Sequence, residues 1–298
     1  MRDVVRAYVD RPIADAAAAA AAARLAARQW GLGVPDVLRI GMNAIFVTGH
    51  EVLRVSAPSV PATASLELAS CLTDAGIRVP RPSRRDVIVA GELSVTAWER
   101  LESVDTPIDW FEVGRMVRVV HSLDRSALPR SVPLPSPSSL PWWDFDALLE
   151  RAAPALDESA RRGMVEVIER HRGWAGLAGQ VICHGDVHPG NVVMTVDGPT
   201  LIDWDLLCWA PPGWDHGPML TWASRWGGDG REYPALAAGY GRSLAADPAA
   251  LAFAELRLVA ATLMRLLAGM VDPAAMPEAE RRLRYWRGDP DAPTWKAQ

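Results

Sequence analysis

The segment Cys183-His184-Gly185-Asp186-Val187-His188-Pro189-Gly190-Asn191, followed by Leu201-Ile202-Asp203-Trp204-Asp205, decides how this sequence is interpreted. Asp186 and Asn191 lie on a stretch that Gly185 and the Pro189-Gly190 pair keep from being a helix. A second carboxylate, Asp203, follows two short apolar runs joined by a turn. Phosphoryl transfer from a nucleotide needs one carboxylate to orient the attacking hydroxyl, and an Asn and an Asp to hold magnesium. We therefore predict that Asp186 positions an acceptor hydroxyl, and that Asn191 and Asp203 bind Mg²⁺.

The composition narrows the class of protein. A chain of 298 residues with 49% hydrophobic residues is long and apolar enough for a globular protein of two lobes. The net charge of −5 gives no basic footprint for nucleic acid. Three cysteines, an odd number, favour a reducing cytoplasm over a disulfide framework. The Ala-rich run near the N-terminus follows several Asp residues and predicts a helix, not a signal peptide, and no stretch is apolar enough to span a membrane.

The first hundred residues predict a small antiparallel sheet with two helices. Asp10 is expected to cap a helix over residues 12–30 that ends at Gly31. A second helix is predicted over residues 62–74, before Gly76. Short apolar runs punctuated by Gly41, Gly49 and Gly91 predict the strands at residues 37–40, 45–47, 52–55, 87–90 and 93–97.

After residue 102 the pattern becomes mainly helical. Short strands are predicted only around the motif, at residues 181–183, 192–195 and 200–202. Helices are predicted at residues 109–122, 144–152, 157–172, 215–226, 231–242, 248–270 and 277–286, with an irregular Pro/Ser-rich connection at 129–141. We therefore predict an α+β chain with an N-terminal lobe at residues 1–98, a hinge at 99–102 and a helical C-terminal lobe at 103–298.

Two other interpretations of the motif have to be weighed. The polar residues could merely cap a loop, although the joint pattern makes this a poor explanation. Alternatively, Cys183, His184 and His188 could bind zinc and serve a metal-dependent hydrolase. The spacing of the two histidines suits a zinc site on a helix, but Pro189-Gly190 argues against a helix here, so His188 is predicted to order the loop.

His184-Gly185-Asp186 with Asn191, then Ile202-Asp203-Trp204-Asp205, resembles the catalytic loop and metal motif of the aminoglycoside phosphotransferase and choline kinase-like family. The resemblance implies a two-lobed protein-kinase-like fold and phosphorylation of a small molecule. Asp215 resembles the Asp that typically follows the metal motif in this family, and His121 resembles the His that often ends its first C-lobe helix.

The resemblance also assigns the nucleotide site. A kinase-type lobe needs a turn that covers the phosphates, a cation on the next strand and a Glu on the following helix. The matching residues are Asn43 and Ala44 in the turn, Arg54 in place of the usual Lys, and Glu67 as the expected partner of Arg54. The hinge that would meet the adenine corresponds to Trp98, Glu99 and Arg100, continuing to Leu101. The implied cofactors are ATP or GTP, with Mg²⁺.

The acceptor is less well defined. Thirteen tryptophans are many for this length, and Trp209 and Trp214, beside Pro-rich turns, are candidates for stacking on a substrate. Asp205 and Asp215 are candidate carboxylates for a cationic substrate. These features favour an aminoglycoside or related amino sugar, and choline, homoserine or a nucleoside-type metabolite fits comparably. A nucleotide-binding pseudokinase with a regulatory role is the remaining alternative.

Overall fold

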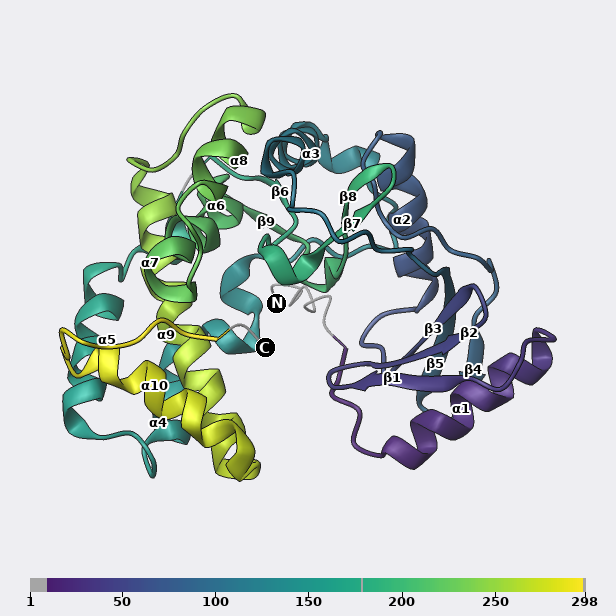
Figure 1. Cartoon of the computed structure of the whole chain (residues 1–298), viewed down its shortest axis with the longest axis horizontal. Helices are drawn as coiled ribbons and strands as arrows, with labels where there is room; N and C mark the ends of the chain where they lie inside the picture. Colours follow the sequence, from purple (N-terminus) through teal and green to yellow (C-terminus); the bar gives the residue numbers. More distant parts are fainter. Residues whose placement is uncertain (1–9, 178, 297–298) are drawn as a thin grey trace, which may run out of the picture. The chain divides into compact units, whose positions relative to one another are not determined.

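The computed structural model describes residues 10–177 and 179–296 (Figure 1). These residues form two compact units, and the chain passes between them several times. The first unit holds the residues up to Asp109, together with Ser122–Leu134 and Asn191–Leu207. The second unit holds Trp110–His121, Pro135–Gly190 and the chain from Cys208 onward. Asp186 therefore belongs to the second unit, whereas the proposed magnesium ligands belong to the first.

The first unit is built on a five-stranded antiparallel sheet, as predicted. The strands run in the order β1-β2-β3-β5-β4. Their bounds are β1 Asp36–Ile40, β2 Ala44–Thr48, β3 Glu51–Ser56, β4 Ile88–Ala90 and β5 Leu93–Glu99. Side chains alternate between buried and half-buried along β2, which is the pattern of a strand with one face on a core. In the register Arg54 of β3 lies opposite Ile45 of β2 and Thr96 of β5.

Helix α1 (Ala16–Gln29) covers one face of this sheet (Figure 1). Its buried stripe consists only of alanines, whose small side chains let the helix lie close to the strands. Asp15 caps the helix by accepting hydrogen bonds from the N–H groups of Ala17 and Ala18. The predicted start at residue 12 with Asp10 as cap is wrong, because the carboxylate of Asp10 binds Arg54 instead.

Helix α2 (Thr63–Asp74) and a hairpin complete the first unit. The hairpin consists of β7 (Val192–Thr195) and β8 (Gly198–Leu201), joined at the predicted Asp197-Gly198 turn. Gly198 has φ 106°, a conformation that favours glycine. The first pair of the hairpin ladder is Val192 with Leu201, so the residues just outside it, Asn191 and Ile202, lie side by side at the open end.

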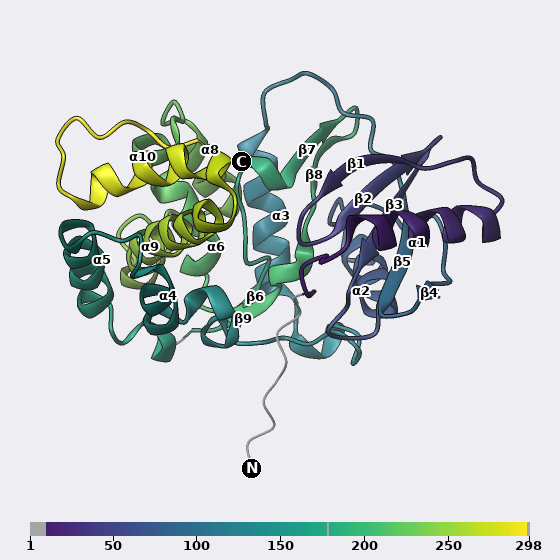
Figure 2. The same ribbon diagram turned by 90° about the horizontal axis from the view of Figure 1, so that it is seen from below.

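The second unit is mainly helical, as predicted. Its bounds are α3 Trp110–Ser122, α4 Phe145–Ala152, α5 Glu158–Arg170, α6 Gly213–Leu220, α7 Trp222–Trp226, α8 Glu232–Tyr240, α9 Pro248–Val271 and α10 Met276–Trp286. Figure 2 shows the long helix α9 with α4, α5, α6 and α10 packed around it. Gly213 and Gly217 allow α6 to approach α9 closely, because a Cβ on either glycine would meet the α9 backbone within 3 Å. None of the helices in the described residues is long and apolar enough to cross a membrane.

Three details differ from the sequence-based predictions. The helix predicted over residues 215–226 is split into α6 and α7 at Thr221, whose hydroxyl donates to the carbonyl of Pro218. A short strand, β9 (Cys208–Ala210), pairs with β6 (Val181–Cys183) and was not predicted. Three single 3-10 turns, at Arg125–Ala127, Pro137–Ser139 and Pro141–Trp143, lie in and around the segment predicted as irregular.

Candidate active site

Asp186 lies in the loop that follows β6. Gly185 has φ 94°, so a side chain at this position would be strained. The Asp186 carboxylate forms an ion pair with Arg257 of α9 and lies 3.4 Å from Nε2 of His188. Burial would raise the pKa of Asp186, but the charges of Arg257 and then His188 outweigh burial and hold the pKa well below its usual range. Asp186 is therefore a carboxylate at neutral pH, and a carboxylate is what a hydroxyl donor needs as its acceptor.

His188 orders this loop, as the sequence predicted. Its Nδ1 accepts a hydrogen bond of 3.1 Å from the N–H of Gly190. Its ring stacks on Trp222 of α7, with 6.1 Å between the ring centroids. The imidazole therefore connects the backbone turn at Gly190 to the carboxylate of Asp186.

Asp215, in the first turn of α6, forms hydrogen bonds with the backbone of the same loop. It is almost fully buried and accepts hydrogen bonds from the N–H groups of His184 (2.8 Å) and Gly185 (2.7 Å). Nε2 of His121 lies 3.0 Å from the same carboxylate, and Nδ1 of His121 lies 3.0 Å from the hydroxyl of Tyr240. Burial would raise the pKa of Asp215, but His121 outweighs it and the pKa is lowered. The prediction that Asp215 binds substrate is therefore wrong, because its oxygens are occupied by the loop.

The zinc interpretation gains no support from the described residues. Among the described residues, the one group of side chains close enough to bind a metal consists of His121, Cys183 and Asp215. The predicted set of Cys183, His184 and His188 does not form such a group. Asp215 already serves backbone donors, and burial raises the pKa of the Cys183 thiol well above its usual value. A neutral thiol is a poor zinc ligand, since the thiolate is the form that binds metal.

The two predicted magnesium ligands lie together at the open end of the β7–β8 hairpin. The N–H of Ile202 donates to the carbonyl of Asn191 at 3.0 Å, which brings Asp203 next to Asn191. The side chain of Asn191 is buried, and that of Asp203 is exposed. Asp203 has φ 64° and is the one non-glycine residue with positive φ in the described part of the chain. An amide oxygen and a carboxylate are hard oxygen donors, so this pair of residues suits Mg²⁺.

Arg54 lies in the first unit between two carboxylates. Its guanidinium lies 2.9 Å from Asp10 and 2.6 Å from Asp205. Burial would lower the pKa of Arg54, but Asp205 and Asp10 outweigh it and raise the pKa. Burial raises the pKa of Asp10, against the opposing charge of Arg54. Nδ2 of Asn43 donates to the same Asp205 oxygen at 3.2 Å, so this carboxylate joins the turn, the strand and the metal motif.

The predicted Arg54–Glu67 pair is wrong. Glu67 lies on the exposed side of α2 and accepts a hydrogen bond from the hydroxyl of Ser131. The buried stripe of α2 includes Leu66 and Leu68 on either side of it, and this packing fixes which way Glu67 faces. Asp205 takes the place expected for Glu67, so its predicted role as a substrate-binding carboxylate is also corrected.

The covering turn between β1 and β2 is present. The carbonyl of Asn43 accepts a hydrogen bond from the N–H of Gly41. Ala44 begins β2 and its methyl group is fully buried in the sheet core, so a nucleotide cannot contact that side chain. Oδ1 of Asn43 is buried and has no hydrogen-bond partner among the described residues, which leaves an acceptor next to Arg54 and Asp205.

The predicted hinge is partly corrected. The N–H groups of Glu99 and Arg100 already donate to the carbonyls of Arg81 (2.8 Å) and His50 (2.9 Å). Trp98 belongs to β5, and its indole N–H donates to Thr96. These backbone donors are therefore not available to an adenine, although the carbonyl groups of the segment are not excluded by this geometry.

The two predicted substrate tryptophans have different outcomes. Trp214 is a core residue: its indole N–H donates to the carbonyl of Gly185, and its ring packs on Trp143 and Phe253. Its predicted substrate contact is wrong. Trp209 lies on β9 and is half-buried, so its contact with substrate stays a prediction.

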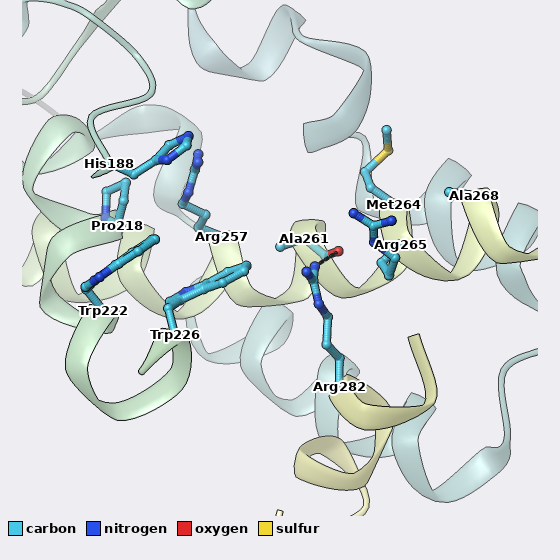
Figure 3. A pocket seen from close by; sticks show the side chains of 10 residues that line it. All are labelled: His188, Pro218, Trp222, Trp226, Arg257, Ala261, Met264, Arg265, Ala268 and Arg282. Atoms are coloured by element: carbon cyan, nitrogen blue, oxygen red, sulfur yellow. Dashed lines mark hydrogen bonds between the residues drawn. The ribbon is translucent and has the colours of Figure 1, made fainter. Parts of the chain in front are cut away.

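A pocket beside Asp186 involves residues that the sequence analysis did not select. Its volume is about 300 Å³, and it extends along α9 from Arg257 to Arg265 and Ala268 (Figure 3). Trp222 and Trp226 of α7 lie nearly parallel on one side, 5.7 Å apart. The signal in the sequence was a pair of arginines, Arg257 and Arg265, eight residues apart in a mainly apolar helix whose other charged residue is Glu255.

Comparison with known proteins identifies the family of the chain. The description "Phosphotransferase enzyme family" matches residues 43–254, which include both motifs and most of the chain. The chain belongs to this family. It is therefore a small-molecule kinase by family, and the predicted resemblance is confirmed. A search of curated proteins by sequence finds no match.

Solved structures of this phosphotransferase type show the same fold. A spectinomycin phosphotransferase, in complex with ADP and spectinomycin, is 14% identical, with a TM-score of 0.64 over 85% of this chain and 89% of that one. A thermostable aminoglycoside phosphotransferase mutant is 15% identical, with a TM-score of 0.65 over 91% of this chain and all of that one. A choline/ethanolamine kinase family protein from Mesorhizobium loti is 16% identical, with a TM-score of 0.59 over 88% and 89%. The predicted protein-kinase-like fold is confirmed.

Proposed function

We propose that this phosphotransferase moves the γ-phosphate of ATP, or GTP, to a hydroxyl group of a small molecule, with Mg²⁺ as cofactor. The observation that carries the proposal is the Asp186 loop. Its carboxylate is ionised by Arg257 and His188, and its backbone is fixed by a buried Asp215. An ionised carboxylate on a fixed backbone can accept a hydrogen bond from a substrate hydroxyl.

On the donor side, the first unit supplies the charged groups. Arg54 is a permanently charged fork that can bind phosphate oxygens, and Asp205 and Asp10 orient it. The orphaned Oδ1 of Asn43 offers an acceptor beside it. Asn191 and Asp203 would hold the metal, which supplies neutralising charge on the phosphates when bound.

On the acceptor side, Asp186 aligns the substrate hydroxyl and receives its proton. The hydroxyl oxygen forms a bond to the γ-phosphorus, and the bond from that phosphorus to the bridging oxygen of the nucleotide breaks, so that ADP leaves. Most of the rate gain is expected from positioning and charge stabilisation, since the transfer asks for little covalent chemistry from the protein.

Aminoglycosides and related amino sugars are the acceptors that the sequence favoured. Solved relatives were captured with spectinomycin or hygromycin B, which supports hydroxylated antibiotics as a starting class. Choline-like alcohols, homoserine and nucleoside-type metabolites remain alternative acceptors. The proposed location is the cytoplasm, on the ground of the three unpaired cysteines.

The decisive experiment compares the wild type with Asp186→Asn in two assays. We expect Asp186→Asn to lose phosphoryl transfer and the slow hydrolysis of ATP, while calorimetry shows nearly unchanged binding of Mg·ATP. Asp203→Asn should instead weaken the magnesium-dependent part of nucleotide binding. Near-normal transfer by Asp186→Asn would refute the assignment of Asp186.

The same assays test the pseudokinase alternative. A pseudokinase would bind nucleotide without turning it over, whereas the proposed enzyme should hydrolyse ATP slowly without an acceptor. The Asp186 carboxylate favours the enzyme, because an ionised group that can orient an acceptor hydroxyl is not needed for nucleotide binding alone.

A further inference from the structure

The pocket beside Asp186 has a charge that does not match aminoglycosides and amino sugars, the acceptors favoured by the sequence. Three arginines line it, Arg257, Arg265 and Arg282, and its lining includes no Asp or Glu (Figure 3). A polycationic aminoglycoside would meet like charges here, which is unfavourable for binding.

Asp205 and Asp215, the predicted carboxylates for a cationic substrate, and two other Asp residues of the chain have other partners. Asp205 binds Arg54, and Asp215 holds the Asp186 loop. Asp144 caps α4, while Asp229 pairs with Arg231 outside the pocket. Each of these four carboxylates therefore has another structural task, and none of them lines the pocket.

The three arginines are not equivalent. Arg257 is paired with Asp186. Arg282 is buried, pairs with Glu278 and donates to the carbonyls of Ala261 and Lys296, so it supports the pocket wall. Arg265 is half-buried, and no described residue forms an ion pair with it. Arg265 is therefore the pocket cation whose charge the described chain leaves uncompensated.

The space between the two ends of the pocket is apolar. Arg257, Ala261 and Arg265 follow one another at intervals of four residues on one face of α9, with Arg265 roughly 12 Å along the axis from Arg257. The small side chain of Ala261 leaves room between them, and the stacked rings of Trp222 and Trp226 also line the pocket (Figure 3). These side chains suit an apolar part of a ligand.

We propose that the acceptor is a hydroxylated organic anion. Its hydroxyl lies at Asp186, its apolar body lies along Ala261 and the stacked Trp222–Trp226 pair, and its carboxylate or phosphate binds Arg265. The inference rests on the proposed function and names the substrate class of that same site. Arginine binds carboxylates and phosphates alike through paired N–H donors, so Arg265 would recognise either group in the same way.

The test uses acceptors that differ only in charge. Linear ω-hydroxy acids are compared with diols and amino alcohols of the same chain length, and with ω-hydroxyalkyl phosphates to separate carboxylate from phosphate. We expect the wild type to phosphorylate the anionic compounds with a kcat/KM about 10- to 100-fold above that of the diols, and the amino alcohols least.

Variants make the assignment specific. Arg265→Glu should reverse the order of anion and amine, Arg265→Gln should remove the preference, and Arg265→Lys should retain part of it. The control is Arg162→Glu, an exposed arginine on α5 outside the pocket, which should change nothing. An unchanged preference in Arg265→Glu, or a wild-type preference for diols or amino alcohols, would overturn the inference.

The outcomes separate this inference from the proposed function. If no compound is phosphorylated, calorimetric titration of the hydroxy acids decides, and absence of binding that depends on Arg265 overturns the inference. ATP turnover that depends on Asp186 would then still support the kinase. Loss of both turnover and transfer to every acceptor would refute the proposed function itself.

Discussion

Replacing Asp215 with Asn separates a loop-holding role from a substrate-binding role. The carboxylate accepts hydrogen bonds from two backbone N–H groups, at 2.8 and 2.7 Å, and lies 3.0 Å from Nε2 of His121. An Asn side chain has one acceptor oxygen and places an NH₂ group where the second oxygen was. One of the two buried backbone N–H groups would therefore face the NH₂ group of the Asn. The remaining hydrogen bonds would no longer have a charged acceptor. Together these losses predict a destabilisation of about 3–5 kcal/mol.

The same substitution should affect catalysis in a characteristic way. Because His184 and Gly185 directly precede Asp186, a loosened loop misplaces the carboxylate, and a misplacement of about 1 Å costs roughly 100-fold in rate. We expect Asp215→Asn to lower kcat and the thermal midpoint together, with little change in the KM for the acceptor. Steady-state kinetics and thermal denaturation measure both, and Asp229→Asn, an exposed Asp on another loop, is the matched control. A raised acceptor KM with unchanged stability would refute this reasoning and restore Asp215 as a substrate ligand.

Two more predictions concern Arg54, whose ion-pair partner differs from the predicted one, and the buried His216. Arg54→Met should weaken Mg·ATP binding and destabilise the protein by about 3–5 kcal/mol, because it leaves the largely buried carboxylate of Asp205 without its cation. Glu67→Gln should change neither property, and equal effects of the two substitutions in calorimetry and denaturation would contradict the corrected pairing. Burial lowers the pKa of His216 from 6.5 to about 4. Between pH 6.5 and pH 4 the unfolded chain therefore binds more protons than the folded protein. The free energy of unfolding should fall as the pH falls through this range, by up to about 3 kcal/mol. Denaturation curves at several pH values should show a flatter profile for His216→Gln, and an unchanged slope would contradict the assignment.

The elements of the candidate active site could be predicted because their signals are local. Gly185 and Pro189-Gly190 mark a loop, and the short apolar runs around it predict β6, β7 and β8 without knowledge of the rest of the chain. The sheet of the first unit was predictable for the same reason, since glycine turns separate its strands. A local pattern fixes which residues form an element and which face of it is apolar.

The partners of charged residues could not be predicted in this way. Arg54 meets Asp10 and Asp205, which are 44 and 151 residues away in sequence, and a sequence pattern carries no distance between such positions. Trp214 was misjudged because a Pro-rich turn beside it suggested exposure, whereas its ring completes a core of aromatic side chains. Strand β9 has only three residues, too few for a periodicity to be visible.

The corrected partner of Arg54 has a consequence for how the donor site is organised. Asp205 follows Asp203 by two residues, so the carboxylate that fixes Arg54, the cation proposed to bind phosphate, belongs to the same short segment as the proposed metal ligand. Asp203 has a left-handed backbone that costs on the order of 1–3 kcal/mol in a non-glycine residue. The contacts of Asp205 with Arg54 and Asn43, together with the hairpin bond between Ile202 and Asn191, hold the chain on both sides of that strained residue. The cation and the metal ligand are therefore positioned by one set of contacts, and a change at Asp205 should disturb both at once.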